Sequence, residues 1–209
     1  MKLIHFQAPP IFTNSYFYYD ENTLDACIID PGGGVDKIME IIKENGLKLK
    51  YILLTHGHYD HMGGVEELKS LTGADILAHK DEAQLLIEPK WNMSKMGAGK
   101  EISIICDRLL EDSEVIELGK GKLSVIHTPG HTAGGACFYD KEGGILFSGD
   151  TLFRSTFGRY DLPTADAKTL FSSIKEKLLT LPDGIKVLPG HEAATTIGHE
   201  KKTNPVVGY

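Results

Sequence analysis

Three histidines and a carboxylate lie within six positions of the chain, directly after a short apolar run. They are His56, His58, Asp60 and His61, in the segment Thr-His-Gly-His-Tyr-Asp-His. Side chains of these types are costly to bury without partners, whereas a divalent metal ion binds imidazole nitrogens and carboxylate oxygens readily. The spacing therefore predicts a metal-binding loop.

Three further candidate ligands follow the same pattern, in which an apolar run leads to a small or glycine-bearing turn and then to His or Asp. They are His131 in Pro-Gly-His, Asp150 in Ser-Gly-Asp and His191 in a second Pro-Gly-His. Loops at strand ends that share one sheet edge gather their side chains, so we expect all seven residues to converge. Seven ligands exceed the four of a tetrahedral zinc site and suit two metal ions that share a carboxylate.

The spacing also divides these ligands between the two ions. The first ion would take His56, His58 and His131. The second would take Asp60, His61 and His191, with Asp150 as the bridge. We expect two divalent ions per chain, with zinc as the first expectation and iron or manganese as alternatives, since all three accept imidazole and carboxylate.

The elements predicted around these loops alternate between strands and helices. Short β-favouring runs bounded by turn residues predict strands over 2–7, 15–19, 26–29, 51–54, 76–78, 115–117, 122–127, 136–139, 145–147 and 186–188. Apolar residues at helical spacing predict helices over 35–44, 64–71, 82–87 and 167–179. Residues 88–99 lose periodicity, which predicts a surface loop that can cover a pocket. The whole pattern predicts one domain, residues 1–209, with two sheets packed face to face and helices outside.

Charge and composition exclude several classes of function. The 209 residues carry a net charge of −7, which is unfavourable for neutralising nucleic-acid phosphates. No apolar run is long enough to cross a bilayer and the first residues lack a signal-peptide pattern, so we expect a cytoplasmic protein without nucleic-acid or membrane partners. Cys27, Cys106 and Cys137 form no CxxC pair, and we expect them to be small buried apolar residues. The oligomeric state is left open.

The chain resembles the metallo-β-lactamase superfamily, and within it the glyoxalase II-like branch of hydroxyacylglutathione hydrolases. The resemblance rests on Ile-Ile-Asp-Pro-Gly at 28–32, the loop 55–61, the segments 128–132 and 147–153, Pro-Gly-His at 189–191 and the tail 195–205. It implies an α/β fold of four layers, an αββα sandwich, with a dinuclear metal site at one edge. The seven ligands of the family fall on the seven positions named above, and Asp30 would support the metal-binding loops without being a ligand.

Such a site favours hydrolysis of a small-molecule thioester. Water between two divalent cations loses a proton near neutral pH, and the same cations stabilise the oxyanion of a carbonyl under attack. Asp60 would orient the resulting hydroxide. A thiolate is a leaving group that a metal ion can hold, which makes a hydroxyacylglutathione-type thioester the expected substrate.

The family contacts for the glutathione carrier are incomplete in this chain. We expect no counterpart of the helical C-terminal domain of glyoxalase II, because 18 residues of this sequence follow His191. Arg159 matches the family cation that touches glutathione, but Asp161 and Ala193 stand where the family has aromatic residues. Arg159 is therefore predicted either to contact substrate or to form a structural ion pair with a carboxylate such as Asp161.

One alternative is a mononuclear iron persulfide dioxygenase of the same superfamily, whose members share a segment like Gly-Arg-Tyr-Asp at 158–161. It would hold a single iron through His56, His131 and Asp150. A noncatalytic metal module is less favoured because we expect no attached flavin or cluster domain. A β-lactamase is disfavoured because those enzymes lack the bridging Asp matched at 150, and a nuclease is disfavoured by the acidic charge balance.

Overall fold

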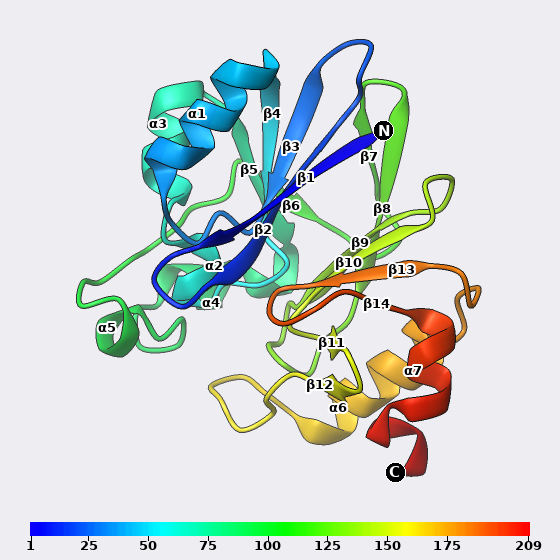
Figure 1. Cartoon of the computed structure of the whole chain (residues 1–209). Helices are drawn as coiled ribbons and strands as arrows, with labels where there is room; N and C mark the ends of the chain where they lie inside the picture. The colour runs from blue at the N-terminus through cyan, green and yellow to red at the C-terminus, as the bar shows by residue number, and fades with distance from the viewer.

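The computed structural model describes residues 1–209, and its first half forms a six-stranded sheet covered on one face by helices (Figure 1). Its strands, in spatial order, are β1 (Lys2–Ala8), β2 (Thr13–Tyr19), β3 (Asp25–Ile29), β4 (Lys48–Leu53), β5 (Asp75–His79) and β6 (Arg108–Leu110). The first three are antiparallel, and β3 to β6 run parallel. The connecting helices are α1 (Val35–Asn45), α2 (Tyr59–Met62), α3 (Val65–Thr72), the 3-10 turn η1 (Lys80–Glu82), α4 (Ala83–Ile87) and α5 (Ser94–Gly97).

The second half forms a second six-stranded sheet. In spatial order its strands are β14 (Thr195–Thr196), β13 (Lys186–Pro189), β10 (Ile145–Gly149), β9 (Ala136–Asp140), β8 (Gly121–His127) and β7 (Val115–Leu118). A hairpin of β11 (Leu152–Phe153) and β12 (Thr156–Phe157) follows β10. The helices are α6 (Ala167–Ser172), which continues as the π-helical segment η2 (Ser173–Leu178), then α7 (Ile197–Thr203) and η3 (Pro205–Gly208).

Alternation along the strands builds three apolar cores. Successive strand side chains point to opposite faces of a sheet. In β2, Tyr16 and Tyr18 enter the core between the sheets, whereas Phe17 enters the core under α1 and α3. In β10, Phe147 faces the other sheet and Leu146 packs against α6 and α7. Four layers result, with α1 and α3 on one side and α6 and α7 on the other (Figure 1).

The predicted αββα sandwich is therefore confirmed, with differences in detail. Every predicted strand and helix is present within a few residues of its predicted bounds, and Gly46 ends α1 in the left-handed conformation at φ 64°. The elements not predicted are β6, β11, β12, β14, α2, α5, α7, η3 and most of η1, and most of them are short or lie in polar segments. Cys27 and Cys137 are buried as expected, but Cys106 is only half buried, so the prediction for this residue is wrong.

The helices of the protein are short. None of them combines the length and the apolar character that crossing a membrane requires.

Candidate metal centre

Each predicted ligand lies just beyond the carboxyl end of a strand, at the same edge of the two sheets. His56 and His58 follow β4, and Asp60 and His61 continue that loop into α2. The others follow three strands of the second sheet: His131 after β8, Asp150 after β10 and His191 after β13. Strand ends of this kind expose side chains while the sheet holds their backbone in place. The structure brings all seven predicted residues together.

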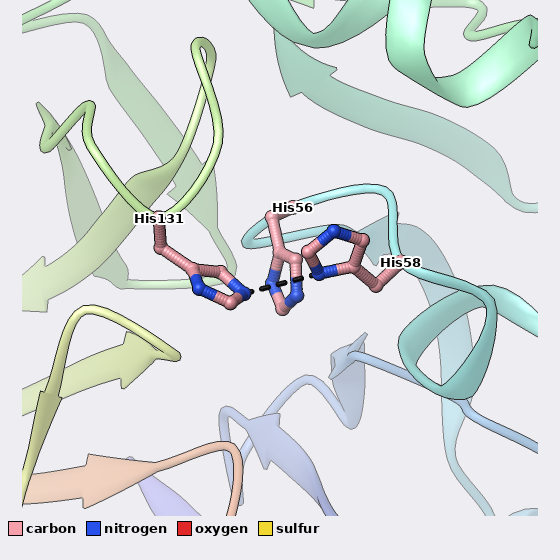
Figure 2. Close-up of side chains that lie close together, drawn as sticks. All are labelled: His56, His58 and His131. Atoms are coloured by element: carbon pink, nitrogen blue, oxygen red, sulfur yellow. Dashed lines mark hydrogen bonds between the residues drawn. The ribbon is translucent and has the colours of Figure 1, made fainter. Parts of the chain in front are cut away.

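His56, His58 and His131 form one compact group of imidazoles (Figure 2). Their ring centroids lie 4.8 Å apart in all three pairs, and the rings are close to perpendicular. Nδ1 of His58 is 3.0 Å from Nε2 of His131. Figure 2 shows that two neighbouring loops supply this group, one carrying His56 and His58 and the other carrying His131. These are the three residues that the sequence assigned to the first ion.

Asp60, His61 and His191 form the second group. Nε2 of His61 is 3.3 Å from Nε2 of His191, and Oδ2 of Asp60 lies 3.1 Å from Nε2 of His191 and 3.4 Å from Nε2 of His61. Two imidazole nitrogens and a carboxylate oxygen thus point at one small volume. The grouping matches the one predicted for the second ion.

Asp150 lies between the two groups. Its Oδ1 is 3.4 Å from Nε2 of His61, and its Oδ2 is 3.7 Å from Nε2 of His131 and 3.6 Å from Nε2 of His191. Gly190 makes this approach possible, since a Cβ there would lie 2.4 Å from Oδ1 of Asp150 and 2.5 Å from Cε1 of His61. One carboxylate therefore faces both sets of imidazoles.

Hydrogen bonds behind the rings hold two of the imidazoles in a metal-binding orientation. Nδ1 of His61 is 2.9 Å from Oδ2 of Asp30, and Nδ1 of His131 is 2.7 Å from the carbonyl oxygen of Arg159. A ring that donates from Nδ1 keeps the lone pair of Nε2 free, which is how metal-binding histidines are oriented. Asp30 also accepts from the backbone N–H and hydroxyl of Thr55, at 2.8 and 2.6 Å. It takes the supporting position predicted for it.

Burial and charge set the protonation of the site. Burial, together with the neighbouring imidazoles, holds the pKa of His56 and His58 well below its usual value, so both rings are neutral and able to bind metal. Burial alone would lower the pKa of His61, but the nearby carboxylates of Asp150 and Asp60 raise it to about 10, so a cation at Nε2 would take the place of a proton. Burial likewise opposes ionisation of Asp60, but His61 and His191 keep its pKa below the usual range.

The residues fit divalent cations on a direct structural criterion. Nε2 of His56, Nε2 of His58 and Oδ1 of Asp150 are buried and have no hydrogen-bond partner. Buried polar atoms are almost always paired, because an unpaired one loses its hydration without compensation. All three atoms belong to predicted ligands, and cations between the groups would satisfy Nε2 of His56 and Oδ1 of Asp150, whereas His58 turns its Nδ1 toward His131.

A pocket of about 540 Å³ opens over the site. Both ligand groups and Asp150 contribute to its floor, and its apolar walls include Ile11, Met93, Met96, Phe153 and Leu162. The segment 88–99 thus does cover a pocket, as predicted, and Met93 and Met96 line that pocket. No sequence pattern indicated these two methionines, because residues of an aperiodic loop have no defined neighbours.

Arg159 forms the predicted ion pair with Asp161, and its predicted contact with substrate stays a prediction. It lines the pocket, and its guanidinium forms two hydrogen bonds with the carboxylate of Asp161, at 2.9 and 3.0 Å. Both side chains are exposed.

Sequence reasoning missed two polar residues at the start of β2 that support the ligands. The hydroxyl of Thr13 donates to Oδ2 of Asp60 at 3.1 Å. The side chain of Asn14 donates to the carbonyl oxygens of Pro189 and Glu192, on either side of His191, at 3.1 and 2.8 Å. No local signal marks them, since Thr and Asn are also ordinary turn residues.

Comparison with known proteins identifies the family. The sequence model of the metallo-β-lactamase superfamily matches residues 8–191. The chain belongs to this superfamily. Proteins of the superfamily bind divalent metals, and this chain has their His and Asp cluster. Hydroxyacylglutathione hydrolase GloC of Haemophilus influenzae is 39% identical over 183 residues, which cover 87% of this chain and 86% of that protein.

Solved structures of the superfamily match the whole sandwich. The crystal structure of the B3 metallo-β-lactamase BLEG-1 has a TM-score of 0.93 and 35% identity, and covers 100% of both chains. That of TTHA1623 in a di-iron-bound form has a TM-score of 0.86 and 37% identity, over 97% of this chain and 98% of the other. ETHE1 from Myxococcus xanthus has a TM-score of 0.85 and 28% identity, over 100% of this chain and 85% of its own.

Proposed function

We propose that this metallo-hydrolase holds two divalent metal ions and cleaves a small-molecule thioester. The observation that carries the proposal is the position of Asp150, whose two oxygens face the nitrogen atoms of both imidazole groups. His56, His58 and His131 would hold one ion, and Asp60, His61 and His191 the other, with Asp150 shared. The identity to hydroxyacylglutathione hydrolase GloC supports a thioester as the substrate class.

Divalent cations bound there would lower the pKa of water toward neutrality and stabilise negative charge on a carbonyl oxygen. The chain's own groups prepare the site for this chemistry. Asp30 and the carbonyl of Arg159 keep the Nε2 lone pairs of His61 and His131 directed inward. Asp60 lines the pocket as an ionised carboxylate, held by Thr13, and can accept a hydrogen bond from a water nucleophile and orient it.

The pocket walls determine where the substrate lies. Met93, Met96, Phe153 and Leu162 offer apolar contact above the ligands and exclude water from the reacting carbonyl. Arg159 is the one cation among the lining residues, and its position suits an anionic group on the substrate. We expect zinc first. Iron is the alternative, because the similar protein TTHA1623 has been solved in a di-iron-bound form.

The test is a thioesterase assay on the zinc-loaded chain without oxygen. We expect release of thiol from S-lactoylglutathione or another acyl thioester, detected with a thiol reagent. Cleavage of a chromogenic cephalosporin without thioester cleavage would contradict the proposal and favour the activity named for BLEG-1. Removal of both metal ions with a chelator should abolish turnover, and added zinc should restore it.

A persulfide dioxygenase is the second candidate. It is favoured by the structural similarity to ETHE1 and by the Arg159–Asp161 segment. One iron would use His56, His131 and Asp150, which leaves His58, Asp60, His61 and His191 without a role as ligands. Oxygen uptake with glutathione persulfide by the iron-loaded chain, in the absence of thioesterase activity, would establish this candidate in place of the first.

A further inference from the structure

A fully buried carboxylate outside the ligand set connects the two loops that carry the first imidazole group. Glu82 ends the turn η1 and precedes α4, and no part of its side chain reaches solvent. Its Oε1 accepts the backbone N–H of Gly57 at 2.8 Å. Its Oε2 accepts the hydroxyl of Thr132 at 2.9 Å and the N–H of Gly134 at 2.8 Å.

The partners of Glu82 are placed beside the candidate ligands. Gly57 separates His56 from His58, and Thr132 directly follows His131. One carboxylate therefore spans the two loops seen on either side of the imidazoles in Figure 2. Since Nδ1 of His58 and Nε2 of His131 come within 3.0 Å, the relative position of these loops determines whether the three nitrogens can share an ion.

Close packing reinforces this connection. A Cβ on Gly134 would lie 2.0 Å from the backbone nitrogen of Glu82, and one on Gly57 would lie 2.8 Å from Leu85 and Leu86 in α4. Both loops thus rest on the same short segment, η1 with α4. Burial raises the pKa of Glu82 to about 7, against the effect of its three hydrogen bonds, so above that pH the side chain is an ionised carboxylate.

All three partners of Glu82 are donors, and this explains why the residue is a carboxylate. An ionised carboxylate only accepts hydrogen bonds, so its two oxygens can meet three donors at once. A glutamine would turn an NH₂ group toward at least one N–H or O–H donor. We propose that Glu82 is a positioning residue, which fixes the His131 loop against the His56–His58 loop and so sets the affinity of the first metal position. This inference rests on the proposed function.

The test is competition between a chelator and the zinc-loaded chain, with Glu82→Gln compared to wild type. Groups that orient metal ligands typically change metal affinity by 10- to 100-fold. We expect Glu82→Gln to lower the affinity for one of the two zinc ions by about that factor and the affinity for the other by less than about threefold. The His131→Ala and His191→Ala variants identify which equivalent belongs to which group.

Glu200→Gln is the matched control. Glu200, a residue of α7, is equally buried and also accepts three hydrogen bonds, from Ser155, Thr195 and Asn204. It should change neither zinc affinity. If Glu82 has a purely structural role, both variants should lose thermal stability and neither should weaken one bound zinc ion more than the other. That result would overturn the inference.

Thr132→Val tests the inference even where Glu82→Gln does not fold. It removes one donor to Oε2 and keeps the carboxylate. We expect weakening of the same zinc equivalent by a smaller factor, and unchanged affinity would overturn the inference. If the wild-type chain binds only one ion, the dinuclear proposal fails. The Glu82 inference is then tested separately, because it still requires Glu82→Gln to bind an ion held by His56 and His131 more weakly than wild type.

Discussion

Oδ2 of Asp30 lies 2.9 Å from Nδ1 of His61, and this contact connects the end of β3 with the loop after β4. Asp30 has φ 51°, in the left-handed region that few residues other than glycine, Asn and Asp adopt readily. Residues held in such conformations cluster at functional sites. The first sheet thus sets the orientation of His61 through the backbone of its neighbouring strand.

Asp30→Asn should reduce zinc affinity by about 10- to 100-fold while the chain stays folded. Asparagine tolerates the left-handed backbone, but its NH₂ group opposes the donors of Thr55 and His61. Chelator competition measures the affinity, and Asp36→Asn, exposed on α1, is the control. Wild-type affinity in Asp30→Asn would contradict the role assigned to this contact.

Asp150→Ala should lose the stable metal pair and lower kcat/KM by about 100- to 1000-fold, because electrostatic stabilisation of the reaction is lost. Zinc should raise the unfolding temperature of the variant less than that of wild type, since the variant has lost one of the groups that hold the ions. Metal analysis and thermal unfolding with and without zinc test this. Two tightly held ions per chain in the variant would contradict a shared carboxylate.

Arg159→Ala should raise KM for an anionic thioester several-fold and leave kcat nearly unchanged. The backbone carbonyl that accepts from His131 is retained, so the metal-binding groups stay in place. Loss of the exposed ion pair with Asp161 should change the free energy of unfolding by less than about 1 kcal/mol. Asp161→Ala removes the same ion pair but keeps the cation, so an equal rise in KM in both variants would assign Arg159 a structural role.

The cysteines should resist thiol reagents in the native protein. Burial raises the pKa of Cys27, Cys106 and Cys137 to about 12, and the thiolate is the reactive form. At pH 8 we expect no rapid labelling by a chromogenic disulfide, and three thiols per chain after unfolding in denaturant. Cys106 is the most accessible of the three. Fast native labelling of Cys27 or Cys137 would contradict the packing of the cores around them.

The ligand cluster could be predicted from the sequence because each ligand stands at a fixed point in a local pattern. His131, Asp150 and His191 each follow an apolar strand and a small turn, and parallel strands such as β10 and β13 end at one edge. The order of these loops along the chain also predicted which ligands share a group. His61 and His191 were predicted to share one, and their Nε2 atoms lie 3.3 Å apart.

The supports of the site could not be predicted in the same way. Glu82 lies in a short polar turn, and its partners are 25, 50 and 52 positions away in the sequence. Met93 and Met96 reach the pocket only because α5 folds back against α2, where a Cβ on Gly97 would lie 2.3 Å from the ring of Tyr59. Such contacts depend on tertiary packing, which leaves no periodic signal in the sequence.

Anomalous diffraction from zinc-loaded crystals would reveal whether two cations share Asp150. We expect two peaks. Each should lie about 2.0–2.2 Å from an oxygen of Asp150, one beside His56, His58 and His131 and the other beside Asp60, His61 and His191. A single peak held by His56, His131 and Asp150 alone would contradict this expectation.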